Sequence, residues 1–144
     1  MKTVRQLLQA KGFDVWAVDP DATVLTALEV MAKKNVGALL VLQEGRMMGI
    51  FSERDYARKM ILKGKHSKDT LVSEVMTKSP ICVDPGKSIE ECMTLMTDNH
   101  IRHLPVLEGD RLLGVVSIGD VVKSIITEQR GTISDLENYI TGKR

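Results

Sequence analysis

The alternation of apolar and polar residues along the chain predicts short helices and strands in a repeating order. Apolar residues recur at helical spacing over 23–35, where Thr23 can cap the first turn. The continuous apolar run 38–42 is typical of a strand covered on both faces, and a turn then leads into a second strand of a hairpin. A further helix is predicted over 52–62.

The same pattern starts again after the basic, polar segment 63–68. Each residue of 18–55 pairs without a gap with the residue 65 positions later. The chain therefore contains an internal repeat. Each copy is predicted to consist of an extended segment or strand, a helix, two strands and a second helix, in that order. Identical pairs include Val18/Val83, Asp19/Asp84, Pro20/Pro85, Met31/Met96, Val41/Val106, Arg46/Arg111, Gly49/Gly114, Ser52/Ser117 and Asp55/Asp120.

Two more helices are predicted near the ends of the chain. Thr3 and Gln6 have the spacing of a capping box at the start of a short helix that ends near Gly12, and the apolar face of this helix recurs in the second copy. Ser134 and Glu137 have the same spacing and predict a separate C-terminal helix. Its apolar face either caps its own domain or contacts a partner chain; this face consists of Ile133, Leu136 and Ile140.

Composition narrows the class of protein. The 144 residues are enough for one ordinary domain, so the two copies must be small, and neither is large enough to bury its sheet alone. The net charge of +1 gives no reason to expect nucleic acid or an acidic membrane as a partner. With two cysteines, no signal-peptide pattern and no long apolar run, the sequence predicts a soluble cytoplasmic protein.

The repeated residues resemble a free-standing pair of cystathionine-β-synthase (CBS) domains, the arrangement called a Bateman module. On this resemblance the first CBS repeat spans 8–68, the second spans 73–131, and 132–144 form a C-terminal helix or tail. The expected fold is α+β: two β-α-β-β-α repeats, related by a pseudo-twofold axis and packed sheet to sheet. The resemblance rests on Val18–Pro20, 36–41 and 49–55, with 83–85, 101–106 and 114–120 in the second copy.

The resemblance implies a regulatory module without catalytic activity or catalytic cofactor. Such modules bind AMP, ADP, ATP, S-adenosylmethionine or NAD in clefts between the repeats, pair into a disc-shaped homodimer, and act on another protein. A structural dimerising adaptor with no ligand is the alternative. An enzyme is the weaker alternative, because the sequence has no phosphate-cradling glycine loop and no spaced nucleophile and base.

Two clefts are implied, each built around one repeated aspartate. Asp120 would hold a ribose, Ser117 and His103 would face phosphate, and Trp16 with Val36 would sandwich an adenine. Arg54 and Arg102 would meet a phosphate in the other cleft. The Asp120 cleft is assigned Lys11, Asp14, Trp16, Val36, Gly37, His103, Val115, Ser117 and Asp120, and the Asp55 cleft Ala38, Ile50, Ser52, Arg54, Asp55, Ser79, Pro80, Ile81, Ile101 and Arg102.

Each candidate also has a plain structural interpretation. Ser52 with Asp55, and the equivalent second pair, have the spacing of helix caps, so a duplicated fold would repeat them without any ligand. Trp16 could equally fill a core. The cysteine and histidine spacings fit no zinc pattern, and Cys92 aligns with Ala27 on a buried helix face.

The two clefts are predicted to be unequal. Gly119 stands where the first copy has Arg54, and Ala38 stands where the second copy has His103. The sites should therefore differ in charge and in affinity, and two identical, independent nucleotide sites in a calorimetric titration would contradict this prediction.

Overall fold

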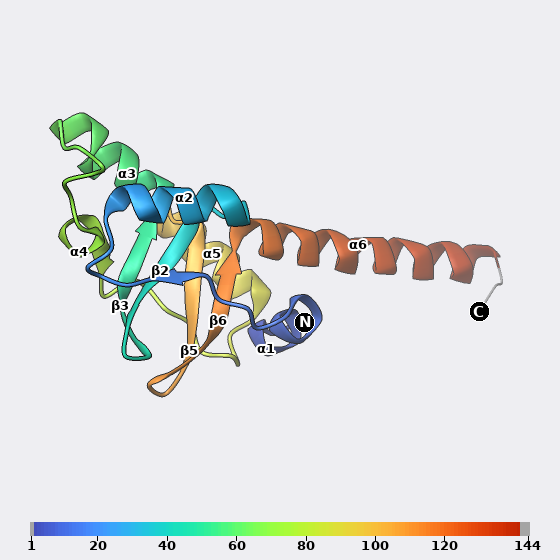
Figure 1. Ribbon diagram of the computed structural model, residues 1–144. Helices are drawn as coiled ribbons and strands as arrows, with labels where there is room; N and C mark the ends of the chain where they lie inside the picture. Colours follow the sequence, from blue (N-terminus) through green and yellow to red (C-terminus); the bar gives the residue numbers. More distant parts are fainter. Residues whose placement is uncertain (1, 142–144) are drawn as a thin grey trace. The chain divides into compact units, whose positions relative to one another are not determined.

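A computed structural model describes residues 2–141 and confirms the α+β fold (Figure 1). The chain divides into two compact units. Unit 1 combines residues 2–13 with 82–141, and unit 2 comprises Asp14–Ile81. The compact units therefore differ from the sequence copies, because the opening helix of the chain belongs with the second copy. The repeat boundaries 8–68 and 73–131 stay a prediction about the sequence.

Unit 2 is built on a four-stranded sheet of order β1-β2-β3-β4. The predicted hairpin is the antiparallel pair β2 and β3, to which β1 adds in parallel and β4 antiparallel. Its elements are β1 (Ala17–Val18), α2 (Val24–Lys34), β2 (Ala38–Gln43), β3 (Arg46–Ser52), α3 (Glu53–Lys59), the 3-10 turn η1 (Ile61–Lys63), α4 (Val72–Val75) and β4 (Thr77–Lys78).

Unit 1 repeats this plan around the antiparallel pair β5 and β6. A single parallel bridge from Val83 to Val106 takes the place of β1. Its elements are α1 (Val4–Lys11), α5 (Ile89–Asn99), β5 (His103–Glu108), β6 (Arg111–Ser117) and α6 (Ile118–Thr141).

Each unit takes its opening helix from the other sequence copy. In unit 1 the backbone amide of Val4 donates to the carbonyl of Lys87 at 2.9 Å. In unit 2 the amide of Val72 donates to the carbonyl of Ala22 at 2.8 Å, which is the equivalent bond. This exchange of helices explains why neither copy forms a compact unit from its own residues.

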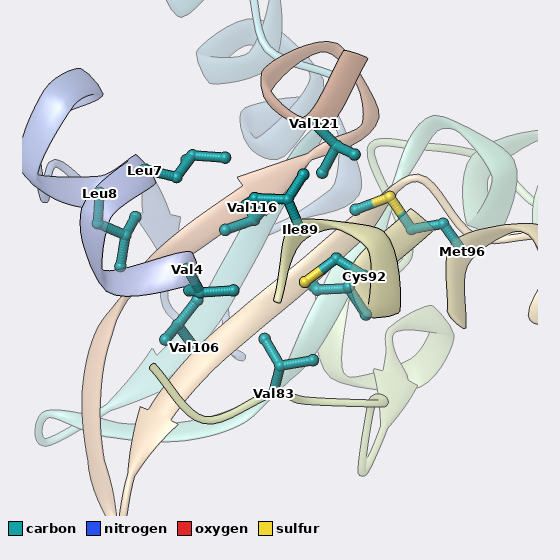
Figure 2. Close-up of a cluster of buried hydrophobic side chains, with 11 residues drawn as sticks. Val4, Leu7, Leu8, Val83, Ile89, Cys92, Met96, Val106, Val116 and Val121 are labelled. Atoms are coloured by element: carbon teal, nitrogen blue, oxygen red, sulfur yellow. The ribbon is translucent and has the colours of Figure 1, made fainter. Parts of the chain in front are cut away.

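The exchanged helices complete the two hydrophobic cores. Val4, Leu7 and Leu8 of α1 are buried against α5, β5 and β6, as Figure 2 shows. Cys92 is fully buried in this core, as predicted, and burial raises the pKa of its thiol to about 11. The core of unit 2 consists of Val24, Ala27, Met31, Leu39, Val41, Phe51, Met60, Val72, Val75 and Met76.

The predicted helix starts are confirmed at Thr3 and Thr23, but the one at Ser134 is wrong. The hydroxyl of Thr3 accepts from the amide of Gln6 in a complete capping box. Ser134 instead lies inside α6, which runs without a break to Thr141. One glycine, Gly131, costs a helix interior only about 1 kcal/mol, so it does not end the helix. Residues 142–144 of the predicted tail lie outside the described residues.

The repeated glycines provide a test of how closely the exchanged segments approach. A Cβ at Gly49 would lie 2.5 Å from the backbone oxygen of Thr77, whereas a Cβ at Gly114 would lie 3.1 Å from the end of the Leu8 side chain. Gly49→Ala must displace a strand and should cost about 1–3 kcal/mol, a fall of roughly 4–12 °C in Tm. Gly114→Ala should cost less because a side-chain end can rotate away; thermal denaturation that ranks the two variants in the opposite order would contradict this packing.

Candidate functional site

The repeated serine and aspartate pairs cap the helices that follow β3 and β6. The amide of Asp55 donates to Ser52 Oγ at 3.2 Å, and the amide of Ser52 donates to Asp55 Oδ2 at 3.0 Å. Ser117 and Asp120 make the same two bonds at 3.2 and 2.9 Å. The capping interpretation is therefore confirmed at both positions. An aspartate that caps a helix can also bind a ligand only where its carboxylate is exposed to solvent.

Asp120 does reach solvent and is paired with a cation. Lys11 Nζ donates to Asp120 Oδ2 at 2.6 Å, and the side chains of the two residues are 33% and 25% exposed. Lys11 is the last residue of α1, so the exchanged helix delivers it to the beginning of α6. Lys11 of the first copy and Asp120 of the second copy are therefore in contact within unit 1. A carboxylate, an amine and a helix N-terminus meet here, which suits both a hydroxyl-bearing and an anionic group.

The pKa of Asp120 reflects this environment. Burial raises the pKa, but the hydrogen bond from Lys11, the amide and hydroxyl of Ser117 and the Lys11 charge together hold it below its ordinary value. Asp120 is therefore ionised at neutral pH, and its carboxylate can accept hydrogen bonds from a ligand.

Asp55 sits in a different environment although its cap is the same. The residue is buried, with 6% of its surface exposed. Its Oδ2 accepts from Ser52, while its Oδ1 accepts from Thr77 Oγ1 at 2.9 Å and from Lys59 Nζ at 3.0 Å. Both carboxylate oxygens are therefore engaged by the protein, so a ligand would have to displace existing partners.

The other residues assigned to the Asp120 cleft fall in both units. In unit 1, His103 is the first residue of β5 and pairs with Ser117 of β6. Val115 precedes Ser117 in the same strand. In unit 2, Trp16 is 41% exposed and belongs to neither core, so the core-filling interpretation is wrong. Unit 2 also contains Asp14, the partly buried Val36, and Gly37, whose carbonyl accepts from the amide of Glu53.

The residues assigned to the Asp55 cleft are mostly in unit 2. Ala38 pairs with Ser52 across β2 and β3, Ile50 is buried in β3, and Arg54 is exposed. Ser79 has a positive φ of 50°, an uncommon conformation for a residue with a side chain. Pro80 and Ile81 follow it, whereas Ile101 and Arg102 belong to unit 1, where the carbonyl of Arg102 accepts from the amide of Ile118.

Sequence reasoning missed three residues that decide the local chemistry. Thr77 and Lys59 occupy the Asp55 carboxylate, and only Lys59 had a signal, its helical i,i+4 spacing from Asp55. Lys34 places its Nζ 4.5 Å from the centre of the Trp16 ring, a cation–π contact. Trp16 therefore already has a cationic partner on its ring.

Two other kinds of site are absent from residues 2–141. No group of three or more His, Cys, Asp or Glu side chains there is placed to hold a metal ion. No helix in that range is long and apolar enough to cross a membrane.

Comparisons with known proteins agree on one family. The model of the CBS domain matches residues 5–62 and 72–127. The mitochondrial CBS domain-containing protein CBSX3 of Arabidopsis thaliana is 40% identical, over 97% of this chain and 72% of its own length. The structure of a CBS-domain protein from Burkholderia ambifaria is 46% identical with a TM-score of 0.85, covering 89% of this chain and 96% of that one. CBSX2 in complex with AMP shares the fold at 23% identity, with a TM-score of 0.73 and coverage of 88% and 98%.

The pairing of Lys11 with Asp120 is testable by pH titration. Lys11→Met removes the hydrogen bond and charge that lower the Asp120 pKa, so this pKa should rise above that of the unsubstituted protein. A lowered pKa stabilises the fold above the unfolded-state value of about 3.9 and loses that effect as pH falls through the folded-state value. The variant should therefore lose about 0.5–1 kcal/mol at neutral pH and less in acid.

Carboxyl-carbon NMR measures the Asp120 pKa directly. Arg5→Gln is the matched control, because it removes another cation of α1, one that pairs with Glu108 instead. An Asp120 pKa that is the same in Lys11→Met and in the unsubstituted protein would contradict the pairing.

Proposed function

The chain belongs to the CBS-domain family, and from that premise we propose that it is a regulatory module that binds an adenosine nucleotide and reports its presence to another protein. The proposal extends the regulatory role expected of CBS-domain proteins to a particular ligand class and a particular site. AMP is the first nucleotide to test because CBSX2, a protein of the same fold, has been solved with it. ADP, ATP, NAD and S-adenosylmethionine are the other candidates.

The observation that carries the proposal is the contact between Lys11 and Asp120. A nucleotide can replace this ion pair on both sides: ribose hydroxyls donate to the Asp120 carboxylate, and a phosphate takes the Lys11 amine. The amides at the N-terminus of α6 favour the same phosphate through their partial positive charge. Both members of the pair are partly exposed, so a ligand reaches them without unfolding the unit.

The Asp55 site supports nucleotide binding less well. Its carboxylate accepts hydrogen bonds from the protein on both oxygens and is almost fully buried. A ribose there would leave Thr77 or Lys59 without its partner, which lowers the net gain from binding. We therefore propose that the Asp120 site binds first and more tightly, and that Asp55 mainly stabilises the fold.

Two other functions compete with this one. A dimerising adaptor without ligand is favoured by the capping boxes, which explain both aspartates structurally. It predicts that no nucleotide changes the stability of the protein. An enzyme would have to consume ATP or NAD above a blank in an Asp120-dependent way. A homodimer of the disc type, with an effector protein as the second partner, is part of our proposal.

Thermal denaturation with millimolar AMP, ATP or NAD tests the proposal. A ligand at 100 times its Kd stabilises the native state by about 2.7 kcal/mol, a rise of roughly 5–10 °C in Tm for a chain of this size. Asp120→Asn should abolish the rise, because the amide keeps an oxygen for the cap but loses the charge and one acceptor.

Asp55→Asn is the matched control. It should lower Tm without ligand, because it disturbs a buried and fully bonded carboxylate, yet keep the ligand-induced rise. If no nucleotide shifts the unsubstituted protein, the proposed function is wrong. An equal loss of the rise in both variants would leave the function standing but refute the inequality of the sites.

A further inference from the structure

The C-terminal half of α6 has no covering element within the described chain. Its first turns pack on the core of unit 1 through Ile118, Val121 and Ile125. Beyond them, residues 126–138 and Ile140 are all exposed. Figure 1 shows this orange-to-red half of the helix continuing past the end of β6.

An apolar stripe runs along this exposed helix. The stripe consists of Val122, Ile126, Ile133, Leu136 and Ile140, which are between 40% and 80% exposed. Their spacing alternates between four and three residues once Gln129 is included, which is the heptad pattern of a coiled-coil seam. A heptad has two positions that face the partner helix. Ile126, Ile133 and Ile140 occupy one of them, and Val122, Gln129 and Leu136 occupy the other.

A helix with this surface gains stability from a partner. Most helical stability in proteins comes from packing an apolar face, and an unsupported segment of this length is marginal in water. Gly131 and the β-branched Thr132 and Ile133 lower the intrinsic helix preference of the segment further. The stripe is therefore the part of α6 whose burial would hold the helix together.

The stripe complements itself when two helices run antiparallel. Placing Ile126 opposite Leu136 of a second copy also sets Val122 opposite Ile140 and Gln129 opposite Ile133. Four of the five stripe residues then meet another stripe residue, Ile133 meets Gln129, and no end is left unmatched. Such a register has the twofold symmetry expected of a homodimer interface.

Charges beside the stripe favour the same orientation. In the antiparallel register Lys123 lies near Glu137 of the second copy, and this attraction occurs twice by symmetry. The Arg130 side chains approach each other near the axis, where exposure to salt and water screens their repulsion. A parallel register places Ile125 beside Arg130 and Thr132 beside Glu137, so it offers no pair of opposite charges.

We propose that two copies of this chain associate through an antiparallel pairing of their α6 stripes. This contact uses a surface separate from the Asp120 site and does not depend on nucleotide binding, so it can fail or hold independently of the proposed function. If the copies also pair as a disc, the helix contact adds one further level of assembly.

Sedimentation velocity across a range of concentrations tests the pairing on the full chain. Leu136→Asp places a charge in the stripe and should halve the mass of the assembly or weaken it at least 100-fold. Ser134→Asp is the control, since it adds the same charge to the same exposed turn on another helix face. Both variants should keep the Tm of the core, because neither side chain is buried.

Two results would overturn the pairing. One is that the unsubstituted protein is monomeric at tens of micromolar, which would mean that the stripe binds a different protein. The other is an assembly of unchanged mass in Leu136→Asp, which would place self-association elsewhere on the surface.

Disulfide trapping tests the orientation. Ile126→Cys and Leu136→Cys, each with Cys82→Ser to remove the partly exposed native thiol, are oxidised separately and as an exchanged mixture. Antiparallel pairing predicts crosslinked dimers chiefly in the mixture, because position 126 of one copy faces position 136 of the other. Efficient crosslinking of either variant alone would overturn the antiparallel register.

Discussion

The exchange of opening helices is the constraint on which the rest of the structure depends. Val4 bonds to Lys87 and Val72 bonds to Ala22, so each compact unit contains residues of both sequence copies. The close approach leaves no room for a side chain at Gly49, and at Gly114 a Cβ would press on Leu8. This explains in packing terms why both copies have glycine at that position. Unfolding either helix would expose a face of the core that belongs to the other copy.

The same exchange makes the two sites unequal. After Leu8 the chain stays helical, and the final turn of α1 carries Lys11 to Asp120. After the equivalent Met76 the chain instead becomes β4, and Thr77 donates to Asp55. The sequence supplies the reason: the first segment, 9–12, has good helix formers and ends in glycine, whereas the second, 77–80, has a β-branched threonine and a serine before proline. One duplicated turn therefore yields one accessible carboxylate and one that is fully engaged.

Much of the fold could be predicted from the sequence because most of its elements occur in both copies. The helix-strand-strand order within each copy, both hairpins, the caps at Thr3 and Thr23 and the buried Cys92 all followed from local patterns, whereas β4 was not predicted. The family resemblance also assigned Lys11 and Asp120 to one cleft, although it did not predict the ion pair between them. The sequence could not show that Thr77 reaches Asp55 or that Lys34 lies over Trp16, because these contacts depend on how distant segments pack. The cap predicted at Ser134 failed because the preceding helix simply continued through Gly131.

The continuity of α6 connects two features that the sequence treated as separate. Asp120 lies in the first turn of the helix and Ile140 in the last. One continuous helix therefore contains both the carboxylate proposed to bind the ligand and the exposed stripe. A nucleotide can influence association only if it binds one arrangement of this helix more tightly than another. Lys11 supplies a physical basis for such a difference, because its hydrogen bond to Asp120 links the beginning of α6 to α1. A ligand that binds both Lys11 and Asp120 replaces this hydrogen bond with its own contacts at the N-terminus of α6.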